Sequence, residues 1–363
     1  MMIDTGYHGG FLSGASRLCI DPSILPSTGS GVRRGILTNF AGTMPDLSRN
    51  IDALLAAGIG LSCLFGPEHG MRGSAQAGAS EPGGIDERTG LVVYDTYLLD
   101  GDALDALLVT AAVDEILVDL RDFGARFGTY LWSMFDVLVS AARLGIAVVV
   151  LDRPNPLGNR PANLTVIGIE PQGLPPGVAD WVPPSPNLPT AESALSYPGT
   201  CLFEGTNVSE GRGTTRPFET VGAGWIDSRF ASVLSKRQLP AVLFREVIFV
   251  PSFGKWAGQQ VRGVQLHIVD RLAFEPLETG VTMLGMLAGL YPRNFEFLPP
   301  GEEGGRPFID LLWGSDALRS QGDRDYADVL AHSPRADNPT SDLRLYDRMS
   351  WNSCTSGSRA VVC

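Results

Sequence analysis

The sequence lacks the features that identify metal centres, disulfide-bonded scaffolds, membrane proteins and nucleic-acid-binding proteins. Its four histidines and five cysteines are scattered over 363 residues, and their spacing matches neither a zinc site nor a disulfide framework. No apolar run reaches the roughly 18–20 residues that a membrane-spanning helix needs. Basic residues are outnumbered by acidic ones, 28 to 40, and form no run, so the net charge of −12 disfavours nucleic acid and anionic membranes as partners.

Several cofactor and catalytic motifs are also missing. No Gly-rich turn follows the first expected strand, where residues 38–42 read Thr-Asn-Phe-Ala-Gly, so a nicotinamide or flavin cofactor is disfavoured. The chain has neither a P-loop nor a Gly-x-Ser-x-Gly nucleophile elbow. We therefore predict no cofactor and no metal. The first 30 residues show no basic start followed by an apolar stretch, so a cytoplasmic location is the default expectation, with export by another route left open.

Three apolar runs carry polar residues directly after their ends. Apolar runs of this length, separated by helix-like stretches, predict buried parallel strands. In an open α/β sheet, ligands bind at the carboxyl ends of the strands. The sequence therefore predicts that one pocket gathers the polar residues that follow the runs 61–65, 116–118 and 148–151, namely Glu68, Asp119, Arg121, Asp152 and Arg153.

The order of the expected elements defines the fold class. Expected strands alternate with expected helices along the first half of the chain. The strands lie at 35–39, 61–65 and 91–94 and at the apolar runs 116–118 and 148–151, and the helices lie at 48–58, 103–112 and 130–144. This order predicts right-handed crossovers and an α/β fold with a Rossmann-like, mostly parallel sheet. Beyond residue 161 the composition of the sequence changes, and we expect a second, smaller α+β domain there. Its expected elements are strands at 242–250 and 261–269 and a helix at 279–290.

The expected domain boundaries follow from these changes in composition. Proline and glycine are frequent between residues 171 and 224, and we expect no regular helix there. The predicted parts are a loose N-terminal segment 1–32, a Rossmann-like domain 33–162, a smaller α+β domain 163–321 and a divergent tail 322–363.

Each polar motif also has a structural interpretation. Glu68, on a loop flanked by proline and glycine, could cap a helix or pair with Arg72, and this is as well supported as a catalytic role. For Asp119 taken alone, an ion pair at a strand end is the simpler interpretation. Three such motifs at the ends of neighbouring expected strands support a functional site more strongly than any one motif does. The polar, Gly-rich stretch 204–216 could hold an anion with its backbone N–H groups.

Five longer motifs resemble those of the exo-acting β-N-acetylmuramidases of the NamZ type, a glycoside hydrolase family. They lie at residues 65–73, 119–127, 151–158, 181–187 and 197–218, within a resemblance that runs from about residue 33 to about residue 320. The resemblance implies a Rossmann-like domain and a smaller domain with a cleft between them. It also implies release of N-acetylmuramic acid from the non-reducing ends of peptidoglycan fragments. Glu68 matches the family's conserved loop glutamate.

Hydrolysis of a glycosidic bond usually needs a proton donor and a second carboxylate across the scissile bond. We expect Glu68 to be the donor and Asp119 or Asp152 the second carboxylate. A guanidinium fork suits the lactyl carboxylate of muramic acid, and asparagine suits hydroxyl and acetamide groups. The expected binding residues for such a muropeptide substrate are His69, Arg121, Arg126, Arg153, Asn155, Asn187, Asn207 and Arg212.

Two alternatives remain open at this stage. One is metal-dependent hydrolysis of a phosphate or ester, with Glu68, Asp119, Asp122 and Asp152 as oxygen ligands. The other is an inactive muropeptide-binding remnant. It arises because residues 159–161 run directly into 162–166, where family members carry a further segment, and because the tail beyond Arg319 lacks the family's helical, aromatic ending.

Overall fold

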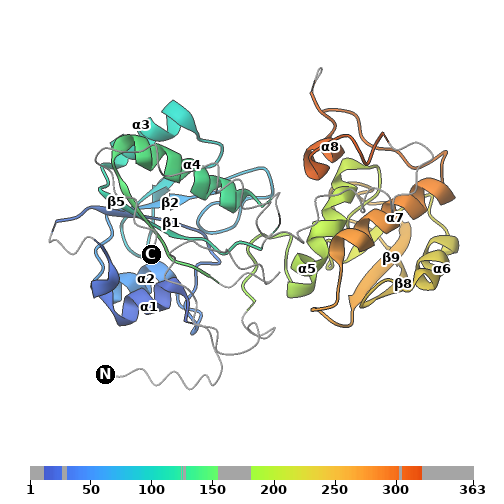
Figure 1. Cartoon of the computed structure of the whole chain (residues 1–363), viewed down its shortest axis with the longest axis horizontal. Coiled ribbons are helices and arrows are strands. Elements are labelled where there is room, and N and C mark those ends of the chain that lie inside the picture. Colours follow the sequence, from blue (N-terminus) through green and yellow to red (C-terminus); the bar gives the residue numbers. More distant parts are fainter. Residues whose placement is uncertain are drawn as a thin grey trace. The chain divides into compact units, whose positions relative to one another are not determined.

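The computed structural model describes residues 12–26, 31–123, 125, 128–153, 181–301 and 305–320. These residues form two compact units, of which the first ends at Pro186 and the second begins at Asn187 (Figure 1). The predicted boundary near residue 162, the junction at 159–166 and the tail 322–363 lie outside the described residues. None of the helices in the described ranges combines the length and the apolar character that crossing a membrane requires.

The first unit contains a six-stranded, mostly parallel sheet, as predicted. Its strands lie in the order β3-β4-β2-β1-β5-β6, and only β3 is antiparallel to its neighbour. Without β3 the parallel strands follow the order third, second, first, fourth, fifth, which is the Rossmann-like doubly wound arrangement. The strands are β1 (Arg34–Thr38), β2 (Cys63–Gly66), β3 (Gly84–Ile85), β4 (Val92–Asp95), β5 (Glu115–Asp119) and β6 (Ala147–Val150).

Helices cover both faces of this sheet because successive strand residues point to opposite sides. Leu64 packs in one apolar cluster with residues of α1 (Gly14–Ile20) and α2 (Asn50–Ala56). Phe65, the next residue, packs in a second cluster with residues of α3 (Gly101–Ala111) and α4 (Thr129–Leu144). Figure 1 shows the two helix pairs on opposite sides of the sheet. The expected end of α4 at residue 144 is confirmed, and Gly145 caps it with φ +72° in the left-handed region that favours glycine.

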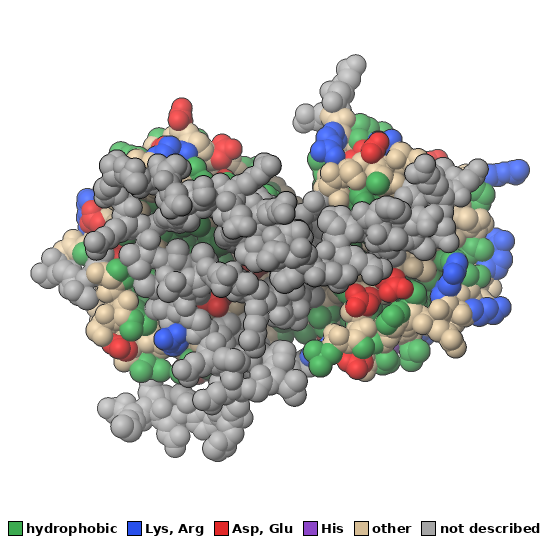
Figure 2. All heavy atoms as spheres, viewed as in Figure 1, with side chains coloured by type: hydrophobic (Ala, Val, Ile, Leu, Met, Phe, Trp, Pro, Cys, Tyr) green, Lys and Arg blue, Asp and Glu red, His purple; other side chains and the backbone are tan. Residues whose placement is uncertain are grey.

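The second unit is the smaller α+β domain that the sequence predicts. Its three strands are antiparallel in the order β7-β9-β8, with bounds Thr220–Ala223 (β7), Val242–Phe249 (β8) and Val261–Ile268 (β9). Its helices are α5 (Ala191–Thr200), the 3₁₀ helix η3 (Cys201–Gly205), α6 (Ser228–Arg237), α7 (Pro276–Leu290) and α8 (Phe308–Trp313). In the face that Figure 2 shows, the described part of the first unit carries both acidic and basic side chains, and basic side chains gather at the right edge of the second unit.

The expectation that residues 171–224 exclude regular helix is wrong for α5. Thr190 caps this helix, accepting a hydrogen bond from the Ser193 N–H, and the next six residues contain neither proline nor glycine. Pro198 enters only near the end, where the chain continues into η3. A Cβ on Gly199 would lie 1.9 Å from the carbonyl oxygen of Pro276, so glycine here lets the backbones of α5 and α7 touch.

Candidate active site

Glu68 lies on a tightly folded loop that follows β2. His69 and Gly70 both adopt positive φ, +67° and +75°, and turn the chain back on itself. The His69 N–H donates to the Ala79 carbonyl at 2.9 Å, and its Nδ1 lies 2.9 Å from the Ala75 carbonyl oxygen. The imidazole of His69 is thus engaged within the loop.

The carboxylate of Glu81 holds the middle of the same loop. It accepts hydrogen bonds from the backbone N–H groups of Arg72 and Ser74, both at 3.0 Å, and the Arg72 guanidinium lies 3.9 Å away. Arg72 therefore pairs with Glu81 and not with Glu68, the partner that the structural interpretation of the sequence offered. Because the loop carries its own internal contacts, it presents Glu68 in a defined position.

The Glu68 side chain is 9% exposed, and each of its oxygens accepts one hydrogen bond from a neutral donor. The Gly78 N–H donates to Oε1 at 2.7 Å, and the Thr129 hydroxyl donates to Oε2 at 2.5 Å. Thr129 is the first residue of α4, so the carboxylate connects the loop after β2 with the start of a helix that packs on the sheet. Within the described ranges, neither a hydrogen bond nor an ion pair joins Glu68 to a lysine or arginine.

Two tyrosines and a second carboxylate lie around Glu68. Burial raises the pKa of Tyr130, and the negative charges of Glu68 and Asp122 add to the effect. Burial, followed by the charge of Glu68, likewise raises the pKa of Tyr97, two residues beyond β4. Both phenols therefore stay protonated near neutral pH. The buried Tyr130 hydroxyl donates to the Pro184 carbonyl at 2.5 Å, which ties the segment that begins at Trp181 to the start of α4.

Asp122 reaches the same helix start from the end of β5. One of its carboxylate oxygens lies 3.1 Å from the position that a Cβ on Gly128 would take, and Gly128 is the N-cap of α4. Glu68 and Asp122 thus flank consecutive residues, Thr129 and Gly128. Sequence reasoning considered Asp122 only as a metal ligand and missed Thr129 entirely. A glycine followed by threonine at the expected start of the 130–144 helix was the available signal.

Asp119 occupies a different environment at the end of β5. It is fully buried, and Arg153 binds it through Nε and, at 2.8 Å, through Nη2. The Asn50 amide donates to the same carboxylate at 2.7 Å. A third contact of the guanidinium, 2.7 Å from Nη1 to the Thr43 carbonyl, fixes Arg153 further. These residues connect the ends of β5 and β6 with the loop after β1 and the start of α2, which is the switch point of the sheet.

Asp152 lies at the far side of the sheet from Glu68. Since β6 and β2 are separated by β1 and β5, three strand spacings put their ends about 14 Å apart. Burial raises the pKa of Asp152, and its backbone carbonyl accepts a hydrogen bond from the Gly14 N–H of α1 at 2.8 Å. Arg121 is partly buried beyond β5. Arg126 and Asn155 lie outside the described residues.

The three predicted binding residues of the second unit are anchored within it. Asn187 is buried. The Asn207 amide donates to the Asn294 carbonyl at 2.7 Å and accepts from the Glu296 N–H at 3.2 Å. Its side chain therefore joins two segments of the unit to each other.

Arg212 belongs to a partly buried charged cluster made of Glu204, Glu210, Arg212 and Lys255. Its guanidinium lies 3.0 Å from Glu204, 3.4 Å from Glu210 and 5.1 Å from the ring centroid of Phe218. Burial raises the pKa of Glu204, opposed by the charge of Arg212. The Lys255 ammonium pairs with Glu210 at 2.9 Å and donates to the carbonyls of Phe203, Thr206 and Val208 at 2.6–3.0 Å.

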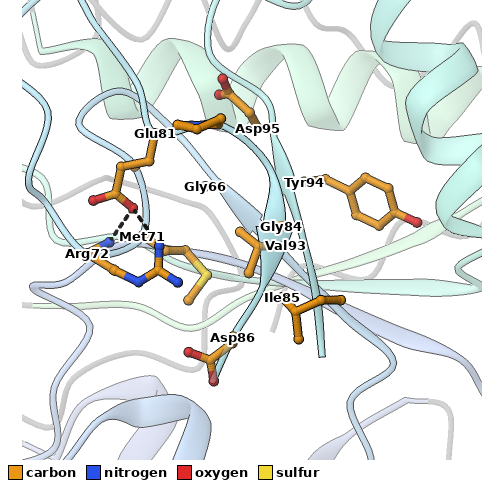
Figure 3. Close-up of a pocket in the computed structure, with 12 residues that line it drawn as sticks. Gly66, Met71, Arg72, Glu81, Gly84, Ile85, Asp86, Val93, Tyr94 and Asp95 are labelled. Atoms are coloured by element: carbon orange, nitrogen blue, oxygen red, sulfur yellow. Dashed lines mark hydrogen bonds and ion pairs between the residues drawn. The ribbon is translucent and has the colours of Figure 1, made fainter. Parts of the chain in front are cut away.

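A small pocket elsewhere in the first unit is not the candidate site. It lies beside β3 and β4, and Figure 3 shows Glu81 and Arg72 at one side of it and Tyr94 at the other. Glu68 does not line it. Its volume of about 20 Å³ holds a water molecule but no sugar ring. Among the described side chains, no three of histidine, cysteine, aspartate or glutamate lie close enough together to hold a metal ion.

Comparison with known proteins agrees with this architecture. The family model described as the N-terminal part of the exo-β-N-acetylmuramidase NamZ matches residues 34–168, and the C-terminal one matches residues 195–331. The peptidoglycan β-N-acetylmuramidase NamZ of Bacillus subtilis (strain 168) is 38% identical over 338 residues, covering 80% of each chain.

Two solved structures of DUF1343-family proteins from Bacteroides fragilis NCTC 9343 also resemble this chain. One has a TM-score of 0.76 at 25% identity and covers 94% of this chain and 98% of its own. The other, with a TM-score of 0.62 at 24% identity, covers 93% and 98% and shows likeness of fold alone.

Fold and site together define a two-unit α/β protein with a buried carboxylate at the carboxyl edge of a Rossmann-like sheet. The matches place it more narrowly, and the chain belongs to the NamZ family.

Proposed function

We propose that this protein is an exo-acting β-N-acetylmuramidase, which releases N-acetylmuramic acid from the non-reducing ends of peptidoglycan fragments. Membership of the NamZ family and the name of the Bacillus subtilis relative support the reaction class. The observation that carries the proposal is the setting of Glu68, a buried carboxylate with two neutral donors, without a cationic partner among the described residues. A carboxylate of this kind is available for proton transfer, whereas one paired with a guanidinium is not.

In the proposed reaction Glu68 gives its proton to the glycosidic oxygen as the bond from that oxygen to the anomeric carbon breaks. A second carboxylate on the other side of the sugar either activates water or attacks the anomeric carbon. General acid catalysis of this type contributes about 10²–10⁴-fold to the rate. Water finally adds to the anomeric carbon and restores the proton balance.

For the second carboxylate, the contacts favour Asp122 over the two residues that the sequence suggested. Asp119 already binds Arg153 and Asn50 with both of its oxygens. Asp152 follows β6, whose end stands about 14 Å from the end of β2, whereas glycosidases hold their two carboxyl groups roughly 5–9.5 Å apart, so Asp152 is the less favoured candidate. Asp122 flanks the same helix start as Glu68.

Recognition of the lactyl carboxylate is assigned to arginines beyond β5. Arg121 and Arg126 follow the strand that carries Asp122, and a guanidinium binds a carboxylate through two parallel hydrogen bonds. Arg153 is committed to Asp119 and is a weaker candidate. Roles of His69, Asn155, Asn187, Asn207 and Arg212 in binding sugar, and a cleft between the domains, stay predictions.

The test is turnover of a chromogenic N-acetylmuramide by the parent chain and by Glu68→Gln. We expect kcat to fall by about 10³-fold in the variant, because the amide cannot supply a proton. Glu87→Gln is the matched control, since Glu87 is exposed on the loop between β3 and β4. Release of N-acetylmuramic acid by Glu68→Gln at the parent rate would refute the proposal.

The turnover assay in excess chelator and a calorimetric binding measurement separate the two alternatives. A metal-dependent hydrolase would lose activity in excess chelator, and the described residues do not supply the ligand set it needs. An inactive remnant would bind muramyl ligands in calorimetry but release no N-acetylmuramic acid.

A further inference from the structure

The two donors that hold Glu68 differ in chemistry and in origin. Gly78 contributes a backbone N–H from the loop after β2, and such a group can only donate. Thr129 contributes a hydroxyl from α4, 61 residues away in sequence. A hydroxyl can donate to a carboxylate and can also accept from a carboxylic acid. The Thr129 hydroxyl is therefore the contact whose hydrogen-bond direction can change with the protonation state of Glu68.

The position of the Thr129 hydroxyl is set by the packing of α4. Further along this helix, Val137 and Ala141 are completely buried in the apolar cluster that covers the sheet. At its first turn, the hydrogen bond from Tyr130 to Pro184 holds the neighbouring residue. These contacts fix the backbone at the start of α4, from which the Thr129 hydroxyl reaches the carboxylate.

We infer that Thr129 is a positioning residue, which orients the Glu68 carboxyl and sets the pH range in which that group works. The inference rests on the proposed function, because it assigns Glu68 to the reaction. The hydrogen bond that the hydroxyl donates to the carboxylate is roughly twice as strong as the one it can accept from the neutral acid, so loss of the Thr129 hydroxyl costs the charged form more and favours the protonated form. The ionisation of Glu68 then requires a higher pH.

Other titratable groups face Glu68 from each element around it. Tyr130 belongs to α4, Tyr97 follows β4, Asp122 follows β5, and His69 is the next residue in the loop. Both tyrosines remain neutral over the working range because burial and nearby negative charge raise the pKa of each. The Thr129 hydroxyl bonds directly to Glu68, and an NMR titration of the Glu68 carboxyl separates its response from those of Asp122 and His69.

The experiment compares the pH dependence of kcat/KM for the parent, Thr129→Val and Thr129→Ser. Valine keeps the shape without the hydroxyl, and serine keeps the hydroxyl. We expect the limb governed by Glu68 to move up by about one pH unit in Thr129→Val, the shift that loss of one hydrogen bond to a charged group produces. We expect kcat to fall by about tenfold at the parent optimum, with KM within twofold. Thr129→Ser should match the parent.

The limb that moves also identifies the role of Glu68. If the carboxyl acts as the acid, the alkaline limb moves to higher pH, because the protonated form is required. If it acts as base or nucleophile, the acid limb moves to higher pH. Thr110→Val is the matched control, since the Thr110 hydroxyl bonds only within α3, to the Ala106 carbonyl at 2.8 Å, and its profile should equal that of the parent.

A Thr129→Val profile that superimposes on the parent's would overturn the inference. A second readout keeps the test independent of the proposed function. Carboxyl ¹³C NMR titration of Glu68, in the parent and in Thr129→Val, should show the same upward shift without any substrate. If the parent turns over no muramide but the titration shifts, the proposed function fails and the role of Thr129 stands. Thr129→Ala provides the same comparison if the valine variant does not fold.

Discussion

Two buried carboxylates stand at strand ends of one sheet and are neutralised in opposite ways. Asp119, after β5, is bound by a guanidinium and an amide and contacts no solvent. Glu68, after β2, is bound by a backbone N–H and a hydroxyl, and 9% of its side-chain surface stays accessible. A buried charge needs compensation in both cases. A cation fixes the carboxylate as an anion, whereas neutral donors leave it free to exchange a proton.

The position of each carboxylate in the sheet explains the division of roles. The crevice of a doubly wound sheet forms where the strand order reverses, here between β1 and β5. Asp119, Arg153 and Asn50 fill this point with an internal network. The candidate site lies one strand further on, between the ends of β2 and β4 and the start of α4. In the proposed function the ligand therefore binds at the edge of the sheet that the general rule gives, beside its central position.

Breaking the ion pair should give the largest effect on stability. In Arg153→Met the Asp119 carboxylate stays buried without its cation, so we expect the free energy of unfolding to fall by about 3–5 kcal/mol. Urea denaturation at pH 7 measures this. Arg88→Met is the matched control, because Arg88 pairs with Asp52 at the surface and its loss should cost below about 1 kcal/mol. Equal losses in the two variants would contradict the contrast drawn between Asp119 and an exposed pair.

The second prediction concerns Asp122 and sharpens the contrast by activity. Asp122→Asn should lower kcat by about 10²-fold, because the amide can neither activate water nor attack carbon. Its unfolding free energy should stay within about 1 kcal/mol of the parent. Asp119→Asn is expected to show the reverse, a loss of stability larger than its loss of kcat at temperatures where it is folded. Full activity in Asp122→Asn would return the role of second carboxylate to another residue.

The smallest effect is expected at Asp152, and it depends on pH. Burial raises the pKa of this group in the folded chain above its unfolded value of 3.8, so the charged form destabilises the fold. This destabilisation is absent below the pKa of Asp152 in the unfolded chain and appears as the pH rises through its pKa in the folded chain. Asp152→Asn should therefore be slightly more stable than the parent at pH 7 and indistinguishable from it near pH 3. A constant difference between pH 3 and pH 7 would contradict this.

The sequence predicted the sheet and its edge well because both depend on local patterns. The strands β1, β2, β5 and β6 begin within two residues of their predicted starts, since uninterrupted apolar runs leave little choice. In the second unit β8 and β9 begin at their predicted starts and α7 begins three residues before its predicted start, whereas β7 was not predicted. The helix α5 was missed, because the frequent proline and glycine of residues 171–224 outweighed the capped stretch 191–197, which contains neither.

The partners at the site could not be predicted in the same way. Asp119 meets Arg153 across 34 residues, and Glu68 meets Thr129 across 61. Strand order decides both pairings, and periodicity does not reveal strand order. The donor at Gly78 is a backbone N–H, a role that the side chain at that position does not reveal. Sequence analysis therefore identified the important carboxylates but not what neutralises them.

The Lys255 ammonium sits among three backbone carbonyls and one carboxylate, a set of oxygens like those that surround a bound potassium or sodium ion. Here the ion is attached to the chain by four methylenes. It cannot dissociate from the protein, so the carbonyls between Phe203 and Val208 keep a cation without taking one from the solvent. The second unit carries its counter-ion as part of its own covalent structure.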